Sequence, residues 1–268
     1  MSNFRRRILM SSIISSNEPI VPEVPFHFSD EEVEKVIVNK YDTNGDGYVT
    51  QKQIEEITSF PAIFQGNSLI ETFDEFNSFI NVTELQGYSF KNCSKLSSIT
   101  FPDSLETIQS ESFSGCSSLV INISIPSLKT IGTRAFYNTP ITDVNDLGNI
   151  EYIASECFGY CKNLNKINIP NTVKSLNNSA FMQCYALEFI DIPENVSSIG
   201  TYCFSGCTKL STIICRSSNP PSLYISSLNQ VNEKINIYVP DESVESYKLA
   251  DGWSNYSDKI RPLSEYVE

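Results

Sequence analysis

The chain has 268 residues, with 19 Lys and Arg against 32 Asp and Glu, and a formal net charge of -13. This excess of negative charge argues against nucleic-acid binding, because it would repel a phosphate backbone. A hydrophobic content of 40%, with 16 Phe and 13 Tyr, favours an ordered fold over disorder. The sequence has no uninterrupted apolar stretch long enough for a transmembrane helix, so membrane insertion is not expected.

Residues 1–25 are expected to form a flexible tail, because they contain prolines and serines without a sustained apolar period. Three arginines, Arg5 to Arg7, precede a short apolar stretch that resembles an export signal but lacks a small-x-small cleavage site. Export would place the protein at the cell surface or outside the cell. The alternative is a cytoplasmic or virion-associated protein.

Residues 26–60 predict a helix-loop-helix of the EF-hand kind. Ser29 and Glu32 have the spacing of a capping box, with Ser29 as the N-cap of a helix over about 30–41. The loop that follows has oxygen ligands and glycine at the positions that a calcium loop requires, but its twelfth position is a glutamine instead of a bidentate glutamate. We therefore expect weak calcium binding, and the alternative is a loop whose Asp and Gly residues only make a good turn. The candidate ligands are Asp42, Asn44, Asp46, Tyr48 and Gln53.

Residues 85–240 carry a repeat of about 23 residues. A period of this length is typical of a solenoid, in which each turn of chain buries its apolar edge against the next. Within a repeat, Leu-x-x-Ile-x-Ile-Pro predicts a short strand that ends at the proline, and Phe-x-x-Cys-x-x-Leu predicts a tight helical turn. Residues 61–84 are expected to close the first coil as an N-terminal cap. The phenylalanines that mark the repeat are Phe90, Phe113, Phe136, Phe158, Phe181 and Phe204.

The cysteines follow the same repeat, because most of the 8 lie either three residues after a marker phenylalanine or directly before one. A residue at one fixed repeat position points into one layer of the stack, where cysteine acts as a small buried hydrophobe. The Cys157/Cys161 and Cys203/Cys207 pairs have spacings that suggest a zinc site. The two pairs are two coils apart, about 10 Å at roughly 5 Å per strand, which is too far for one zinc ion.

Residues 241–268 are expected to form a C-terminal cap. Asp241 is the predicted N-cap of a short helix with Val244, Tyr247 and Leu249, and Trp253 is expected to close the end of the stack.

The exposed face of the stacked strands is the expected working surface, because its outward residues do not serve the core. We expect it to bind a protein or glycan partner, with Phe189 as the anchor. A polar outward stripe is also what any soluble solenoid must show, and a structural or assembly role, as in an appendage or a virion, is the alternative. Catalysis is not expected, because His27 is the sole histidine and lies outside the repeats. The outward residues are Ser98, Thr100, Lys166, Asn168, Phe189, Asp191, Thr212 and Ile214.

The repeat, as in Ala180-Phe-Met-Gln-Cys-Tyr-Ala-Leu-Glu-Phe-Ile-Asp-Ile-Pro193, resembles the BspA-like class of leucine-rich repeat, found in surface antigens of oral and gut anaerobic bacteria. The resemblance covers about 85–240. It implies an α+β repeat fold: a right-handed leucine-rich-repeat solenoid of about 23-residue coils, with a helical EF-hand-like segment before it and a helical cap after it. It also implies a non-catalytic protein that adheres to a host or bacterial surface. An EF-hand-like or dockerin-like calcium loop is a recurring companion of such repeats, and Gln53 departs from both versions.

Overall fold

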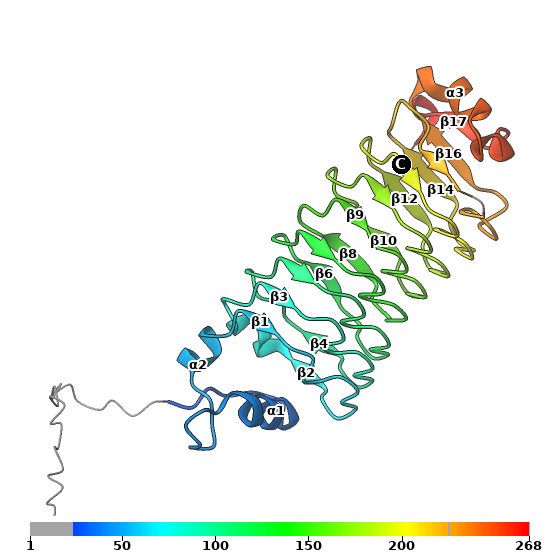
Figure 1. Ribbon diagram of the computed structural model, residues 1–268. Helices are drawn as coiled ribbons and strands as arrows, with labels where there is room; N and C mark the ends of the chain where they lie inside the picture. The colour runs from blue at the N-terminus through cyan, green and yellow to red at the C-terminus, as the bar shows by residue number, and fades with distance from the viewer. Residues whose placement is uncertain (1–23, 225, 268) are drawn as a thin grey trace, which may run out of the picture.

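The computed structural model describes residues 24–224 and 226–267, which form one elongated rod of stacked turns of chain (Figure 1). The predicted tail, residues 1–25, and the export-like segment lie almost wholly outside the described residues. A helical segment stands at one end of the rod, and α3 and β17 stand at the other. The solenoid expected from the repeat period is confirmed.

Most coils contribute one short strand to each of two sheet faces. The helices are α1 Glu31–Tyr41, α2 Gln51–Glu55 and α3 Val244–Leu249, and the 3-10 helices are Asp74–Ser78, Asp241–Ser243, Trp253–Tyr256 and Leu263–Glu265. The first sheet face contains β2 Thr72–Phe73, β4 Ser98–Ile99, β6 Asn122–Ser124, β8 Asp143–Asp146, β10 Lys166–Ile167, β12 Phe189–Ile192, β14 Thr212–Cys215, β16 Asn236–Val239 and β17 Ile260–Pro262. The second sheet face contains β1 Ser59–Phe60, β3 Glu84–Leu85, β5 Thr107–Ile108, β7 Thr130–Ile131, β9 Tyr152–Ile153, β11 Ser175–Leu176, β13 Ser198–Ile199 and β15 Ser222–Leu223.

Neighbouring strands on each face pair in parallel, coil upon coil, but neither face is one continuous sheet. On the first sheet face the pairing is interrupted between β4 and β6 and again between β10 and β12. On the second sheet face it is interrupted between β7 and β9. The break between β10 and β12 lies where the candidate site is found.

The parallel pairing begins earlier than the predicted first repeat at 85. β1, at the end of the predicted EF-hand segment, pairs with β3, and β2, in the predicted cap, pairs with β4, so both sheet faces begin before residue 85. Phe60, Phe73, Phe76 and Phe79 fill the interior of this first coil, all with no exposed surface. The 3-10 helix at 74–78 turns Phe76 inward, which accounts for the helix-like spacing of these rings.

Helix α1 begins one residue later than its sequence pattern suggested. The N-cap is Asp30, whose carboxylate accepts the amides of Glu32 and Val33 at 2.9 and 3.2 Å. The predicted N-cap, Ser29, instead donates its amide and hydroxyl to Glu75 in the first coil. The capping-box prediction at Ser29 is therefore wrong, because the neighbouring carboxylate takes the helix amides.

Asp30 also fastens the helical segment to the solenoid. Its second oxygen accepts the amides of Glu71 and Thr72 at 2.7 and 3.1 Å. Partial burial opposes ionisation of this carboxyl, but the four amides together hold its pKa below the usual value. One side chain thus joins the start of α1 to the first coil.

The turns between coils use a left-handed backbone at two fixed positions around each marker phenylalanine. Around Phe181, Ser179 and Gln183 have φ of 56° and 62°. This conformation costs a non-glycine residue about 1–2 kcal/mol. It lets alternate amides face the next coil, where Ser179, Phe181 and Gln183 donate to carbonyls at 2.8–2.9 Å. The predicted tight helical turn is thus a series of turns that forms its own hydrogen-bonded row.

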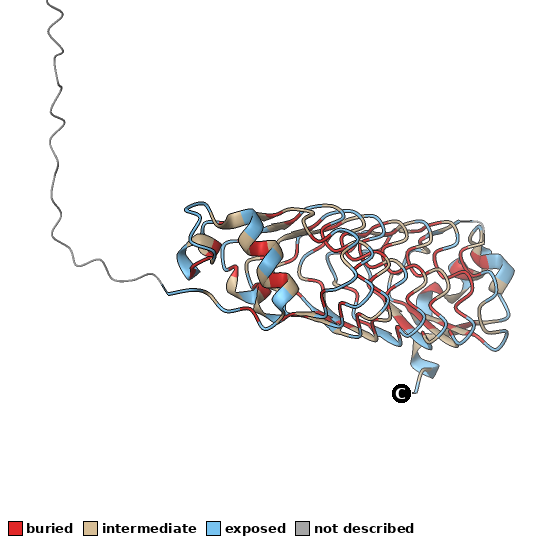
Figure 2. Ribbon diagram, turned by 90° about the horizontal axis from the view of Figure 1, so that it is seen from below, coloured by how far each residue is buried: buried red, intermediate tan, exposed pale blue. Residues whose placement is uncertain are grey.

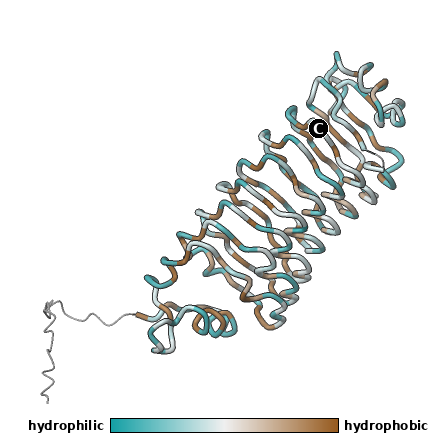
Figure 3. The backbone as a smooth tube through the Cα atoms, in the orientation of Figure 1, coloured by the Kyte–Doolittle hydropathy of each residue, from teal (hydrophilic) through white to brown (hydrophobic). Residues whose placement is uncertain are grey.

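The core runs the length of the rod as a stack of parallel phenylalanine rings. From Phe64 through Phe90 to Phe204, successive rings are 5.1–5.8 Å apart with interplanar angles of 3–11°. Such offset-stacked pairs stabilise a core beyond the area that they bury. Figure 2 shows the buried residues along the inside of the coils, and Figure 3 shows hydrophobic residues recurring from coil to coil.

The eight cysteines are free and buried, as expected for repeat positions in the core. Five of them form a second row, in which each thiol donates to the carbonyl of a phenylalanine in the preceding coil at 2.9–3.1 Å. Burial raises the pKa of Cys93 and of Cys161 to about 12. These two thiols are therefore protonated at neutral pH in the folded chain.

A loss of stability is expected as the pH rises above about 8. Unfolded thiols ionise near their ordinary pKa of about 8.5, so between about pH 8 and 12 the unfolded chain binds fewer protons than the folded one. The stability that the thiols with raised pKa contribute is therefore complete only below about pH 8 and falls as pH approaches 12. Urea titrations at pH 7, 9 and 10.5 would measure this loss of stability.

At pH 8 the eight thiols should react with a thiol reagent only after unfolding. Rapid labelling of the folded protein would contradict this expectation.

Beyond β16, the chain packs a compact helical segment against the last coil. Trp253 is fully buried, its indole donates to the carbonyl of Pro221 at 2.7 Å, and its ring lies 5.1 Å from that of Tyr247. Asp241 does not cap α3, contrary to the prediction, because its carboxylate accepts the amide of Ser264 at 3.0 Å. Leu249, expected on the apolar side of the helix, is 83% exposed.

Candidate functional site

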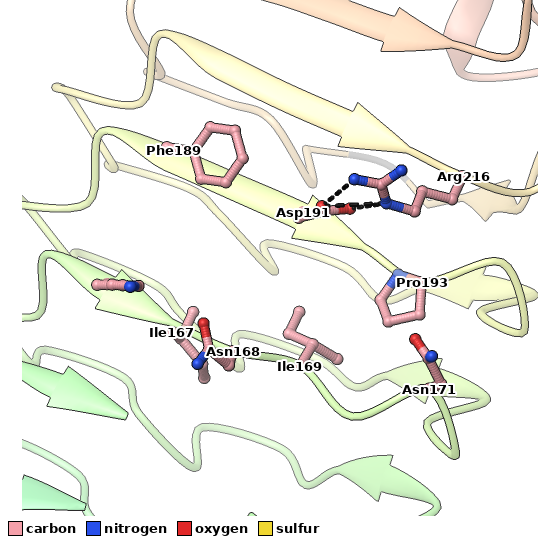
Figure 4. Close-up of a pocket in the computed structure, with 9 residues that line it drawn as sticks. Ile167, Asn168, Ile169, Asn171, Phe189, Asp191, Pro193 and Arg216 are labelled. Carbon is pink, nitrogen blue, oxygen red and sulfur yellow. Dashed lines mark hydrogen bonds and ion pairs between the residues drawn. The ribbon is translucent and has the colours of Figure 1, made fainter. Parts of the chain in front are cut away.

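A pocket opens on the first sheet face where β10 and β12 fail to pair. Its volume is about 230 Å³. Figure 4 shows side chains from β10, from β12, from the segments that follow these two strands and from the residue after β14 gathered around this opening. The polar and aromatic side chains that line it are Lys166, Asn168, Asn171, Phe189, Asp191 and Arg216.

The β12 side of the pocket combines a half-exposed aromatic ring with an ion pair. Phe189 is 39% exposed, although it lies on a strand whose alternate residues are buried. Asp191, two residues along the same face, is held by Arg216, whose Nε and Nη2 donate to its oxygens at 2.8 and 2.6 Å. The ion pair fixes both side chains in the pocket wall and leaves the charge of that wall balanced.

The β10 side carries a lysine and two amides. Asn168 donates its amide nitrogen to the carbonyl of Asn145 at 3.0 Å, which turns the amide oxygen toward β12 (Figure 4). Lys166 is paired in register with Asp143 of β8, yet no ion pair joins the two side chains. Lys166 instead lines the pocket. The structure thus brings together four of the predicted partner-binding residues.

Beside this pocket, the C-terminal segment lies over the first sheet face. The ring of Tyr266 stacks on Phe189 at 6.2 Å and meets Tyr238 edge-on at 5.1 Å. Between Phe189 and Tyr238 in the sheet lies β14, where Ile214 is only 2% exposed. Ile214 was expected on the exposed stripe, but this part of the face is covered. Thr212, also in β14, remains half-buried next to Phe189.

Ser98 and Thr100 lie several coils away and do not join the pocket. Both hydroxyls are directed to Asp74 of the first coil, and the contact from Thr100 measures 3.4 Å. Thr100 lines a separate cavity of about 240 Å³ with Asn77, Phe101 and Asp103 among its neighbours. The predicted stripe is therefore interrupted and does not form one continuous site.

The side chains of the loop from 42 to 53 point back at their own backbone. The oxygens of Asp42 accept the amides of Gly45 and Gly47 at 2.8 and 2.9 Å, and Asp46 accepts the amide of Tyr48 at 3.2 Å. These hydrogen bonds hold the pKa of Asp42 below its usual value, with the Gly47 amide as the largest cause. Asn44 donates to Asp46 at 2.8 Å. The loop thus contains several carboxylate and amide oxygens, which are the type of ligand that a hard cation prefers.

Gln53 at the twelfth position of the loop already has a partner. Its amide oxygen accepts the backbone amide of Thr50 at 2.7 Å and completes the capping box of α2. At the eighth position, Val49 accepts the amide of Phe26 at 2.7 Å, beside an antiparallel bridge between Pro25 and Thr50. Within residues 24–224 and 226–267, the structure contains no group of three or more His, Cys, Asp or Glu side chains that could hold a metal ion.

Two further observations bear on function. His27 is exposed on the segment before α1, away from the pocket between β10 and β12. Within the described part of the chain, none of the helices has the length and apolar character needed to span a bilayer.

Sequence reasoning did not find Arg216 or Asn171, which complete the pocket. Both follow the end of a strand, where the period of two that identified the outward residues no longer applies. Arg216 could have been found from charge pairing between coils, because it lies one coil beyond Asp191, as Lys209 does beyond Glu188.

Three solved structures are similar to this chain. A leucine-rich cell surface protein from Faecalibacterium prausnitzii is 24% identical with a TM-score of 0.48, and the match covers 61% of this chain and 54% of that protein. A leucine-rich repeat protein from Bacteroides ovatus is 23% identical with a TM-score of 0.41 over 68% and 59% of the two chains. The pneumococcal vaccine antigen PcpA is 17% identical with a TM-score of 0.32 over 69% and 65%. This chain therefore spans little more than half the length of the first two.

No curated protein matches the chain. A family pattern does: the BspA type leucine-rich repeat region, in 6 copies, matches residues 49–163 and 129–247. The two matches together cover well over half of the sequence and contain both sheet faces up to β16. With its stacked coils, phenylalanine core and parallel strands, the chain belongs to the BspA-type leucine-rich-repeat family.

Proposed function

We propose that this protein binds a protein or glycan partner at the pocket between β10 and β12, without catalysing a reaction. The observation that carries the proposal is the break in strand pairing between β10 and β12. It leaves a pocket on the first sheet face between two sets of paired strands. Solenoids commonly use such extended faces for binding. A binding role of this kind fits a protein that lies at the cell surface or outside the cell and faces a host or bacterial surface.

The composition of the pocket suits binding better than bond cleavage. Its charged side chains are one lysine and one closed Asp191–Arg216 pair. The cysteines of the solenoid, which could act as nucleophiles, are buried and do not line it. No nucleophile in the pocket is paired with a base, which covalent catalysis requires.

Replacing Phe189 with serine should weaken binding of the partner about five- to thirty-fold, as for an exposed aromatic anchor worth about 1–2 kcal/mol. The partner would be found by capture on panels of extracellular-matrix proteins and bacterial surface glycans, and its affinity measured by biolayer interferometry. The matched control is Tyr152→Ser, a ring of similar exposure, 43% against 39%, on the second sheet face. Equal binding by the two variants would contradict the proposal. A large fall in the melting temperature of Phe189→Ser would assign the ring to the fold.

We also propose that the loop from 42 to 53 binds calcium weakly and steadies the junction of α1 with the first coil. The carboxylates of Asp42 and Asp46 and the oxygen of Asn44 support this, because they lie in one loop with glycine at its sharp turn. The engagement of Gln53 with Thr50 argues for low affinity, since a full ligand set would require that bond to open.

Calcium titration should give a dissociation constant in the range of about 10⁻⁴–10⁻³ M, typical of weak extracellular sites. Calcium at ten times that constant should stabilise the folded chain by about 1.4 kcal/mol. Calorimetry and melting curves with and without calcium would measure both effects. Asp42→Asn should remove them, whereas Asp103→Asn, an exposed aspartate outside the loop, should not. No heat and no thermal shift at 10 mM calcium, about ten times the weaker limit, would dismiss the metal.

A further inference from the structure

We infer that the pocket between β10 and β12 recognises a sugar ring that carries a carboxylate, as found at the ends of acidic glycans. The inference rests on the proposed binding function and names the class of ligand. Three features of the pocket carry it: an unpaired cation, an aromatic face and two side-chain amides.

The cation is Lys166, which breaks a rule followed by most basic residues of the repeats. These pair with a carboxylate one coil away, as Lys129 does with Glu106 at 2.7 Å and Lys174 with Glu151 at 3.0 Å. Among the lysines between 85 and 224, all of which are described, only Lys162 and Lys166 have no ion pair. Since Lys162 lines a different cavity, Lys166 is the one uncompensated charge at the pocket between β10 and β12.

The remaining charges of the pocket cancel each other. Asp191 is bound to Arg216 through two guanidinium nitrogens, so this pair adds no net charge. Among the side chains that line the pocket, only the charge of Lys166 is therefore unbalanced, in a chain whose formal net charge is -13. A ligand carboxylate would gain an ion pair with Lys166 without displacing an existing one.

The other walls suit a sugar ring. The face of Phe189 carries the negative side of the ring quadrupole, which attracts the weakly positive C–H hydrogens of a sugar. Asn168 keeps its amide oxygen free to accept a hydroxyl, because its amide nitrogen already donates to Asn145. Asn171 adds a second amide at the end of the pocket (Figure 4). An amide offers both donors and acceptors, as a set of ring hydroxyls requires.

The size of the pocket favours a single ring over a peptide segment. Its volume of about 230 Å³ is below the 300–1,000 Å³ that is usual for drug-sized ligands. An extended peptide would instead use the unpaired edges of β10 and β12. An acidic peptide is therefore the alternative that the experiment must separate.

The test uses the whole chain and compares matched sugars by ligand-observed NMR and calorimetry: methyl glucuronide against methyl glucoside, and sialyllactose against lactose. We expect each acidic sugar to bind at least tenfold more tightly than its neutral counterpart, with an affinity that falls as salt rises. Lys166→Gln should abolish the preference for the acid and leave neutral-sugar binding unchanged. Lys162→Gln removes an equally unpaired charge outside this pocket. It should change neither the preference for the acidic sugar nor the binding of the neutral sugar.

Equal binding of acidic and neutral sugars, or a preference that survives Lys166→Gln, would overturn the inference. Tighter binding of a glutamate-rich peptide than of any acidic sugar would also overturn it and assign the pocket to acidic protein segments. If no sugar binds but capture of a matrix protein depends on Phe189, the inference fails and the proposed function stands. If no captured partner depends on Phe189, the proposed function itself fails. Melting temperatures of all variants, compared with the parent chain, would exclude effects of misfolding.

Discussion

Truncation of Phe136 to alanine is expected to lower the free energy of unfolding by about 3–5 kcal/mol, as for other large buried rings. Phe136 lies near the middle of the stacked rings, 5.1 Å from Phe113 and 5.8 Å from Phe158. Its removal leaves a cavity that two neighbouring coils share, and it cuts the ring stack in two. Urea denaturation, followed by circular dichroism, would measure the loss.

Leucine at the same place should cost less, about 1–1.5 kcal/mol, because it fills most of the cavity. The chain contains a natural precedent, since Leu228 occupies the marker position of the coil after Phe204 and is 3% exposed. The prediction is contradicted if alanine and leucine destabilise the chain equally. That result would mean that the neighbouring coils collapse into the space, and that the rings are not a rigid column.

The second large effect is expected from Gly132→Ala. A methyl group built at Gly132 would lie 2.6 Å from the carbonyl carbon of Gln109 and closer still to the amide of Ser110. Both atoms belong to the backbone of the preceding coil, so the added carbon must push two coils apart. We expect a loss of about 3 kcal/mol, the upper part of the range for overpacking, with a fall in melting temperature.

Gly66→Ala is the matched control for this variant. Gly66 has a left-handed backbone with φ of +73°, but no atom lies within 4 Å of the added carbon. Alanine there suffers only the conformational strain, about 1–2 kcal/mol. Gly132→Ala must therefore be the more damaging of the two. The reverse order would show that coil spacing adapts easily and that turn conformation limits stability.

The stacking of coils was predictable because a fixed repeat forces equivalent residues into equivalent places. The spacing of Phe90, Phe113 and Phe136 predicted the stacked coils, and the position of Cys184 in the repeat predicted its burial. The second sheet face was harder to predict. Its strands, such as β11 and β13, have two residues each, which is too short for an alternating pattern to stand out.

The helix caps were misassigned for a local reason. Ser29 and Asp30 are adjacent and both are good N-cap residues, so only the docking of Asp30 on Glu71 and Thr72 decides between them. Asp241 had the right chemistry for a cap, but the amide of Ser264 competes for it. In both cases a partner distant in sequence determined the outcome.

The candidate pocket was half predictable. Alternation along the strands placed Lys166 and Phe189 outward, and the structure brings them together at one opening. The missing pairing between β10 and β12 has no counterpart in the sequence pattern. The position of Tyr266 over Phe189 and Tyr238 was not predictable from the sequence pattern either. It depends on the C-terminal segment folding back over strands that are distant in the sequence.

The interruptions of the two sheet faces have a mechanical consequence. Where β4 and β6 do not pair, β5 and β7 do; where β7 and β9 do not pair, β6 and β8 do; and where β10 and β12 do not pair, β11 and β13 do. No cross-section through the rod is therefore without strand hydrogen bonds on at least one side. When the rod is pulled or bent, the coils can therefore separate slightly at an interruption of one sheet face. The paired strands on the opposite face still hold those two coils together.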